Sequence, residues 1–196
     1  MRDNRMCRRR RRAPVVREHA RREPFSLRVL CHTPRMAKRA TRYWLMKSEP
    51  GTYSIDDLER DGTEPWDGVR NYQARNFMRD MAKGDLAIFY HSSAQPTGAV
   101  GVCRICREAY PDATQFNKKS PYYDAKSSKE DPRWSLVDVE FVEKFGETIS
   151  LQALKENPAL EGMTVTQKGS RLSVQPVDKV HFKRVLKMAG AKTKLR

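Results

Sequence analysis

The sequence predicts a single mixed α+β domain, in which strands and short helices surround a small β-barrel. Two observations favour this class. Strand-like and helix-like segments follow one another without the regular alternation that builds a parallel βαβ sheet. In addition, no glycine-rich phosphate loop joins a strand to a helix.

Charge divides the 196-residue chain into three parts. The formal net charge is +15, but residues 1–42 hold fifteen Lys and Arg against three Asp and Glu, and residues 183–196 hold six against none. We therefore expect a disordered basic arm over residues 1–42, one domain over residues 43–190 and a basic tail over residues 191–196. The arm could bind nucleic acid or act as a nuclear import signal, but Met36 opens "MAKRATRYW" and reads like a natural start, so no function is assigned to the arm.

Several protein classes are excluded by composition. No stretch approaches the ~20 apolar residues of a membrane span, and the N-terminal region lacks the pattern of a secretory signal or a transit peptide. The four cysteines support neither a disulfide framework nor secretion. We expect a monomer without a cofactor, located in the cytoplasm, or in the nucleus if the protein is eukaryotic.

The first elements can be placed by periodicity and capping. "YWLMK" (43–47) predicts a strand that ends in a turn at residues 48–51. "SIDDLER" predicts a short helix, with Ser54 as N-cap and Asp57 at the reciprocal capping position. A longer helix follows and should end near Gly84, because four apolar residues recur at helical spacing. These residues are Ala74, Phe77, Met78 and Met81.

The later elements follow the same logic. Residues 85–92 and 98–109 predict a strand pair, and residues 109–133 a long excursion, which is typical of a functional or mobile loop. Residues 134–145 form the clearest strand. Ser150 should cap a short helix that Pro158 ends, residues 171–177 predict a further strand, and Asp178 should cap a last helix before Gly190.

Two cysteines and one histidine could carry chemistry. Cys103 and Cys106 have metal or redox spacing, but no second ligand pair accompanies them, and positions three apart in a strand face opposite sides. They are therefore interpreted as plain core or surface cysteines. His91 could activate Ser48 or Ser92, yet no nucleophile elbow or orienting acid is evident. A strand-end histidine that is hydrogen-bonded to the backbone is the simpler interpretation.

Lys47 and Glu49 form another candidate pair. A desolvated lysine beside a carboxylate can transfer protons. An ion pair at the turn is the commoner explanation.

The segment "WDGVRNYQARNFMRDM" (66–81) is harder to explain by packing alone. Asn71 lies three residues before Ala74 and seven before Met78, which predicts that it shares the buried stripe of the helix. A buried amide needs a partner, which either helix capping or a ligand can supply. Asn, Arg and an aromatic ring together can hold one unpaired nucleobase by its edges and faces. Both interpretations remain open.

Five motifs in order resemble the EVE domain family: "YWLMKSEP", "WDGVRNYQARNFMRDMAKGD", "FYHSS", "YPD…YYDAKS" and "SRLSVQPV". The resemblance covers residues 43 to about 190, and the Arg-rich arm departs from it. It implies a PUA-like mixed β-barrel with peripheral short helices, and a pocket that binds a modified nucleobase in DNA or RNA without catalysis. The pocket residues carried over are Trp44, Lys47, Ser48, Trp66, Asn71, Arg75, Tyr90, His91, Ser92, Arg171 and Ser173.

The leading hypothesis is therefore a nucleic-acid reader with no metal. The base would stack on Trp or Tyr while Asn71, Ser48 and Arg171 read its polar edge. Four lysines in "NKKSPYYDAKSSK" would contact phosphates: Lys118, Lys119, Lys126 and Lys129. One alternative is an amidohydrolase that resembles ASCH-type relatives and acts on a modified nucleoside through Lys47, Glu49 and His91. The other is an RNA-associated interaction module with a vestigial pocket.

Overall fold

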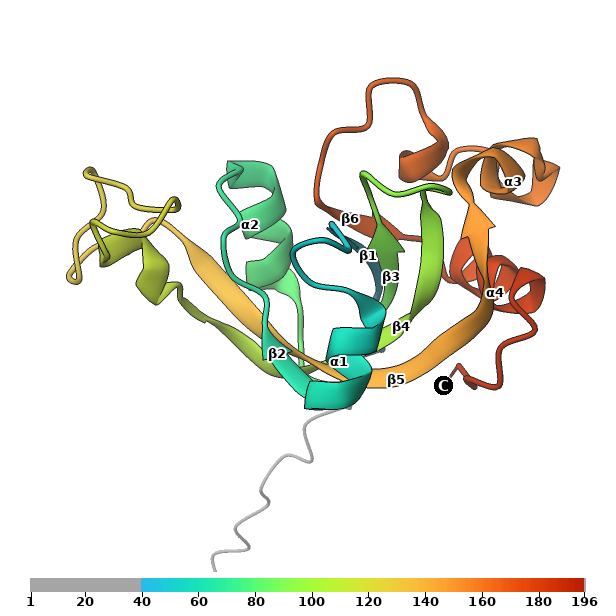
Figure 1. Ribbon diagram of the computed structural model, residues 1–196, viewed down its shortest axis with the longest axis horizontal. Helices are drawn as coiled ribbons and strands as arrows, with labels where there is room; N and C mark the ends of the chain where they lie inside the picture. Colours follow the sequence, from blue (N-terminus) through green and yellow to red (C-terminus); the bar gives the residue numbers. More distant parts are fainter. Residues whose placement is uncertain (1–39, 196) are drawn as a thin grey trace, which may run out of the picture. The chain divides into compact units, whose positions relative to one another are not determined.

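The computed structural model describes residues 40–195, so most of the predicted basic arm lies outside the described residues. The sheet has six strands in the order β2-β5-β4-β3-β1-β6 (Figure 1). Their bounds are β1 Tyr43–Ser48, β2 Thr63–Pro65, β3 Leu86–His91, β4 Gly98–Pro111, β5 Ser135–Ser150 and β6 Val174–Val177. β1 and β3 are parallel, and every other neighbouring pair is antiparallel. β2 was not predicted.

The long strands β4 and β5 curve strongly (Figure 1). Their pairing has several register shifts, and such irregularities allow a sheet to bend. The two strands also approach closely, since a Cβ atom on Gly101 would lie 2.6 Å from the carbonyl oxygen of Glu143. Within residues 40–195, β2 and β6 remain the two edges of the sheet. The α+β class is confirmed, with a curved sheet that stays open where a complete barrel would close.

Four helices flank the sheet: α1 Ile55–Asp61, α2 Tyr72–Asp80, α3 Leu151–Glu156 and α4 Lys179–Met188. The predicted caps at Ser54 and Ser150 are confirmed, since their hydroxyls accept hydrogen bonds from the first-turn amides. Asp178 is the N-cap of α4, but its side chain makes no capping hydrogen bond. α2 ends at Asp80, earlier than Gly84 would indicate.

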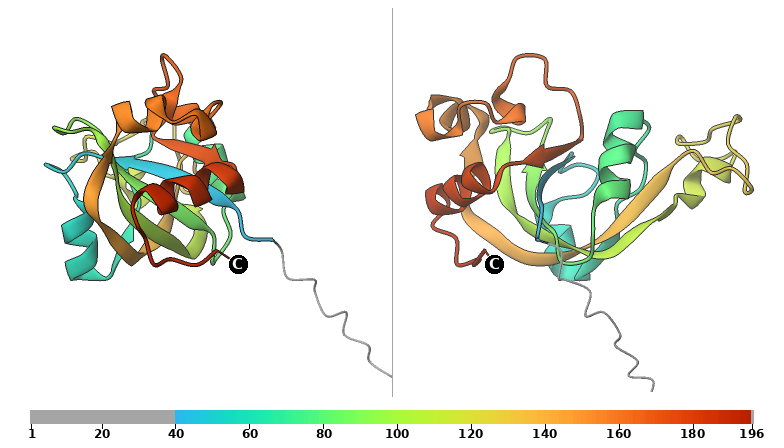
Figure 2. Two further views of the ribbon diagram at one scale, coloured as in Figure 1. Left: turned by 90° about the vertical axis from the view of Figure 1, so that its right-hand side faces the viewer. Right: turned by 180° about the vertical axis from the view of Figure 1, so that it is seen from behind.

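Two apolar cores occupy the two faces of the sheet, because side chains along a strand alternate between faces. Trp44 and Met46 of β1 belong to one core, together with residues of α1 and α2. Tyr43 and Leu45 belong to the other, together with residues of α3 and α4. Figure 2 shows α3 and α4 together at one end of the curved sheet, with α1 and α2 away from them.

The parallel pairing of β1 and β3 sets up the candidate site. It aligns Ser48 with His91, so both strands end at the same edge of the sheet. The segments that leave these strands and the segment before β6 therefore meet there. Elsewhere, Cys103 is buried and Cys106 half-buried as free thiols on β4. Among residues 40–195 there is no His, Cys, Asp and Glu cluster that could hold a metal, and no helix long and apolar enough to span a membrane.

Candidate functional site

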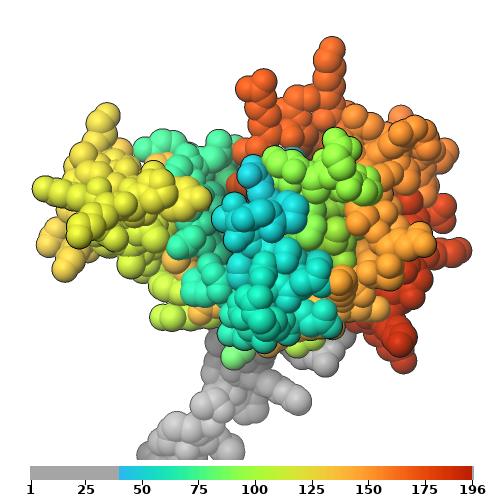
Figure 3. All heavy atoms as spheres, viewed as in Figure 1, coloured from blue at the N-terminus to red at the C-terminus, as the bar shows by residue number. Residues whose placement is uncertain are grey.

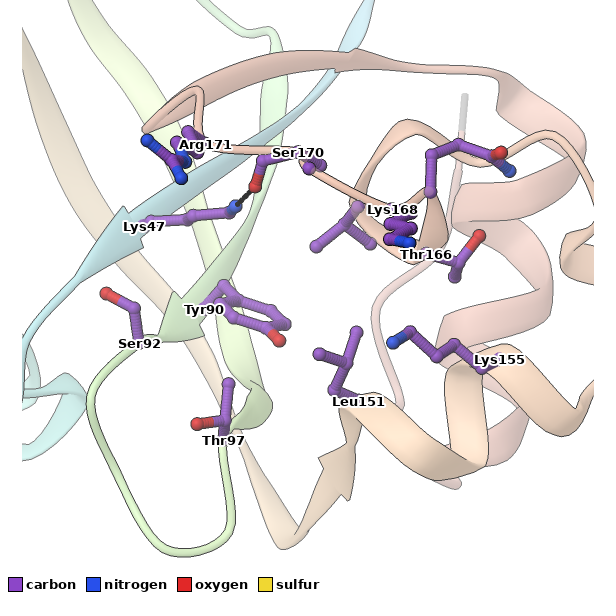
Figure 4. A pocket seen from close by; sticks show the side chains of 13 residues that line it. Lys47, Tyr90, Ser92, Thr97, Leu151, Lys155, Thr166, Lys168, Ser170 and Arg171 are labelled. Carbon is purple, nitrogen blue, oxygen red and sulfur yellow. Dashed lines mark hydrogen bonds between the residues drawn. The ribbon is translucent and has the colours of Figure 1, made fainter.

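A cavity of about 620 Å³ opens between the ends of β1 and β3, the start of α3 and the segment 165–171 (Figure 4). Its lining contains neither a carboxylate nor a histidine. Four basic side chains contribute to it: Lys47, Lys155, Lys168 and Arg171. Within the described part of the chain, none of the four forms an ion pair. The cavity is therefore positively charged and uncompensated.

Lys47 connects β1 to the segment that precedes β6. Its Nζ donates a hydrogen bond to the Ser170 carbonyl oxygen at 3.0 Å, and its backbone N–H donates to the Ser173 carbonyl oxygen at 2.7 Å. Burial lowers the pKa of the Lys47 ammonium. The predicted ion pair with Glu49 is wrong, because the Glu49 carboxylate instead accepts a hydrogen bond from Ser93 Oγ.

Tyr90 contributes a buried hydroxyl to the cavity. The residue is 2% exposed, and Figure 4 shows its hydroxyl directed toward the space beside Leu151. No described protein group hydrogen-bonds to this hydroxyl. Burial raises the pKa of Tyr90 to about 12, so the hydroxyl keeps its proton at neutral pH. A buried polar group without a partner is costly, and because this oxygen is closed to solvent, a ligand in the cavity would satisfy it once neighbouring side chains shift.

The neighbouring strand ends are held by their own hydrogen bonds. Ser92 donates to the Ser48 carbonyl oxygen from both its backbone N–H (2.8 Å) and its Oγ (3.2 Å). Ser48 Oγ donates to the Tyr53 carbonyl oxygen at 2.6 Å. His91 Nε2 accepts a hydrogen bond from the Ile55 backbone N–H at 3.1 Å. The backbone-bonded interpretation of His91 is thus confirmed, and of these three strand-end residues only Ser92 lines the cavity.

The expected residues of α2 and the tryptophans lie outside the cavity. Trp44 and Trp66 are 3% and 8% exposed in the apolar core, and Trp44 Nε1 donates to Asp85 at 3.1 Å. Asn71 is exposed, so its predicted burial is wrong. It is the N-cap of α2, and its side chain accepts a hydrogen bond from Ala74 N at 3.0 Å. An N-cap residue has extended backbone dihedrals, so helical spacing does not place its side chain.

The arginines of this region bind the excursion between β4 and β5. Arg75 Nη1 donates to the Arg133 carbonyl oxygen at 2.9 Å. Arg70 Nη1 donates to the buried Asp112 carboxylate at 2.7 Å. The Asp112 carboxylate also accepts hydrogen bonds from Thr114, and these bonds and Arg70 lower its pKa despite the opposing effect of burial.

Buried Gln115 joins separate parts of the same excursion through hydrogen bonds. Its amide donates to the carbonyl oxygens of Asp112 and Trp134, and its side-chain oxygen accepts from Trp134 N and Ser127 Oγ. The excursion is therefore internally hydrogen-bonded. It stands out from the body in Figure 3. It exposes the four predicted phosphate-binding lysines, Lys118, Lys119, Lys126 and Lys129.

The structure thus divides the predicted residues into two groups. Lys47, Tyr90, Ser92 and Arg171 line the cavity, and Ser173 adjoins it through the Lys47 backbone. Trp44, Ser48, Trp66, Asn71, Arg75 and His91 do not line it. Sequence reasoning missed further lining residues, namely Thr97, Leu151, Lys155, Val165, Thr166, Gln167, Lys168, Gly169 and Ser170. The segment "QKGSR" (167–171), which is polar and basic and lies next to the last motif, could have indicated some of these lining residues.

Comparison with known proteins agrees with this fold. A family model described as EVE domain matches residues 42–188. Mouse thymocyte nuclear protein 1 is 44% identical over 170 residues, which cover 77% of this chain and 75% of that protein. Human thymocyte nuclear protein 1 is 41% identical over 175 residues, which cover 80% of this chain and 77% of that protein.

Solved structures match over the same region. A Pseudomonas syringae protein superposes with a TM-score of 0.73 and 49% identity, over 75% of this chain and 99% of that chain. The human THYN1 protein in complex with 5-methylcytosine-containing DNA superposes with a TM-score of 0.72 and 41% identity, over 78% of this chain and all of that chain.

Proposed function

Because this chain belongs to the EVE domain family, we propose that it is a non-catalytic reader that takes one modified nucleobase of DNA into the cavity beside Lys47 and Tyr90. The family resemblance predicted from the five motifs is confirmed. The cavity carries the proposal, since it combines uncompensated positive charge with a buried, unpartnered hydroxyl.

The cavity has the size and chemistry that such a ligand requires. Its volume of about 620 Å³ lies within the range of roughly 300 to 1,000 Å³ that is usual for ligand pockets. Tyr90 can donate or accept one hydrogen bond at a base edge, whereas Lys47 can only donate. Exposed Lys168 and Arg171 lie at the rim, where the phosphates that flank an inserted base would pass.

The modification is proposed from a relative. The human THYN1 protein has been crystallised with DNA that contains 5-methylcytosine, and 41% identity over 78% of this chain supports the same ligand class here. The lysines of the excursion, Lys118, Lys119, Lys126 and Lys129, are proposed to contact the DNA backbone. The proposed unit is the domain over residues 43–190, with the arm and tail as basic flanking segments.

The hydrolase alternative receives less support from the geometry. Its three candidate groups do not converge, because neither Glu49 nor His91 lines the cavity. Each is already engaged, Glu49 with Ser93 Oγ and His91 with the Ile55 backbone N–H. Lys47 alone lacks the partner that would carry a proton to or from a substrate.

The decisive experiment removes only the Tyr90 hydroxyl. Tyr90→Phe should weaken binding of 5-methyl-2′-deoxycytidine by about 2- to 10-fold, the cost of one lost hydrogen bond. The same change should leave the free energy of unfolding of the free protein unchanged or raise it, because the hydroxyl has no partner there. Calorimetric titration and urea unfolding measure the two quantities.

Tyr110→Phe is the matched control. Its hydroxyl donates to Asp138 at 2.5 Å, away from the cavity, so the same substitution should lower stability and leave nucleoside affinity unchanged. Equal nucleoside affinity of the wild type and Tyr90→Phe would contradict the proposed binding site. If mass spectrometry of the recovered nucleoside revealed a product that Lys47→Ala abolishes, the protein would be an enzyme.

A further inference from the structure

Exposed aromatic rings concentrate away from the cavity, near α2 and the excursion. Among residues 40–195, four large hydrophobic side chains are exposed, and three of them are Tyr72 (52%), Tyr122 (38%) and Tyr123 (39%). The fourth is Val180 on α4. An exposed tyrosine alone is ordinary, but three within one region need an explanation.

Tyr72 is held in a fixed orientation despite its exposure. Its ring stacks on Trp134 with a centroid separation of 4.9 Å and an interplanar angle of 27°. The Arg75 guanidinium lies 4.8 Å from the same ring, and Arg133 Nη1 donates to the Tyr72 hydroxyl at 3.3 Å. The ring is therefore restrained from below by Trp134 and at its hydroxyl by Arg133.

The outer face of the Tyr72 ring is left uncovered by these partners. The Arg75 guanidinium also lies 5.9 Å from the Trp134 ring. If Arg75 covered the face of Tyr72 opposite Trp134, its distance from the Trp134 ring would approach the sum of the Tyr72–Trp134 and Arg75–Tyr72 distances. The observed distance is far shorter than that sum. Arg75 therefore lies toward the edge of the Tyr72 ring. The 52% exposure of Tyr72 agrees with one open ring face.

The support beneath this ring is rigid. Trp134 is 6% exposed, and its Nε1 donates to Asp124 at 2.8 Å while its backbone N–H and carbonyl bond to Gln115. Restraint matters for binding, because an ordered side chain loses little conformational entropy when a ligand arrives. The pair Tyr72–Trp134, hereafter the stacking platform, is thus preorganised.

Basic side chains lie next to the stacking platform, together with the Asp124 carboxylate that accepts a hydrogen bond from Trp134 Nε1. Arg75 and Arg133 contact the stacking platform directly. The exposed lysines of the excursion form no ion pair within the described residues. Aromatic faces next to basic side chains are the combination that binds unpaired nucleotides.

The stacking platform and the cavity lie toward the same edge of the domain. Figure 1 and the right-hand view of Figure 2 show the excursion, the start of α2 and the segment 165–171 projecting to the same side of the sheet. α2 stands between the other two. One strand could therefore pass over all three.

We propose that the stacking platform takes a second, unpaired base of the DNA strand whose modified base occupies the cavity. The inference rests on the proposed function and extends it from one base to a strand. A base can stack on the open face of Tyr72 only when it is unpaired or extruded, so the bound segment is single-stranded on that side of the modified base.

The test uses a single-stranded DNA of about twelve nucleotides, within the range of single-strand binding sites, with one central 5-methylcytosine. Tyr72→Ala should weaken binding of this strand roughly 5- to 100-fold, the cost of one lost base–aromatic stack, and Tyr72→Phe should stay within about 2-fold. Affinity for free 5-methyl-2′-deoxycytidine should not change in either variant. Val180→Ala, which trims an exposed apolar side chain elsewhere, is the matched control.

A second measurement keeps the protein wild type and so avoids any effect on folding. Each position that flanks the 5-methylcytosine is replaced in turn by an abasic site, and one position should reproduce the loss seen for Tyr72→Ala. Two outcomes would overturn the stacking-platform proposal alone, provided that the free nucleoside still binds. One is unchanged strand affinity with an abasic site at every flanking position, and the other is unchanged strand affinity of Tyr72→Ala. Failure of the wild type to bind either the nucleoside or the strand would overturn the proposed function itself.

Discussion

The cavity and the region of α2 with its excursion contain similar side chains but use them differently. In the cavity, the Tyr90 hydroxyl has no hydrogen-bond partner, and Lys47 Nζ makes a single hydrogen bond, to a carbonyl oxygen. Around α2, Arg70 donates mainly to groups of the excursion, and Arg75 donates once to the excursion and twice to Asn76 beside it. Residue types alone therefore do not distinguish a binding site from a structural brace. The difference lies in which polar groups remain unsatisfied.

The largest expected effect tests the structural side of this comparison. Asp112→Ala leaves the Arg70 guanidinium without its buried partner, which should lower the free energy of unfolding by about 3 to 5 kcal/mol. Nucleoside affinity of the folded protein should be unchanged. Urea unfolding and titration measure the two, with exposed Asp131→Ala as control. A loss of affinity without a loss of stability would reverse the assignment of the two regions.

Lys47→Met tests the binding side. The ammonium should donate a charged hydrogen bond to the ligand, so its loss should reduce affinity for 5-methyl-2′-deoxycytidine about 10- to 100-fold. Lys187→Met removes the same charge from an exposed position on α4 and should have no effect. Equal affinities of the two variants would mean that the cavity does not bind the nucleoside through Lys47.

Asn71→Ala separates capping from recognition. The side chain accepts a hydrogen bond from Ala74 N, and removal of such a cap typically costs about 1 kcal/mol of stability. Asn71→Ser should retain most of it. Nucleoside affinity should stay constant in both variants, and a selective loss of discrimination between methylated and plain cytosine would restore Asn71 to the recognition site.

The smallest effect concerns pH. Burial lowers the pKa of His91; Asp56 raises it by a smaller amount, and Lys144 lowers it further. As the pH falls, His91 is therefore protonated at a higher pH in the unfolded state than in the folded state. Stability from this residue is present above the ordinary histidine pKa of about 6.5 and is lost as pH falls below that value toward the folded pKa. Urea unfolding from pH 7.5 to 5 should show a shallower decline for His91→Gln, and identical pH profiles would contradict it.

Local signals allowed much of the fold to be predicted. Ser54 and Ser150 were recognised as caps because the capping side chain and its target amide are three residues apart. The parallel pairing of β1 with β3 could not be predicted, because it joins segments about forty residues apart without a sequence marker. β2 was missed because three residues that end in Pro65 carry no periodicity.

The candidate site was predicted less completely for the same reason. Helical spacing placed Asn71 on the buried stripe, but spacing applies only inside the helix, and Asn71 precedes it. Lys155 and Lys168 were missed because they reach the cavity from α3 and from the segment before β6, which only the tertiary fold brings next to Lys47. The unpartnered hydroxyl of Tyr90 depends on burial from several elements, which no short motif encodes.

The excursion has a consequence for how the protein could be adapted. Its ends are set by the pairing of Pro111 with Ser135, so it is an insertion at the tip of a hairpin. Doubling the length of such a loop costs only about 0.6 kcal/mol in closure entropy. Residues added or removed between Asn117 and Asp124 would change how far Lys118 and Lys119 reach without altering the register of the sheet. Under the proposed function, the length of nucleic acid that these lysines contact is therefore adjustable by insertion and deletion, independently of the base proposed to enter the cavity.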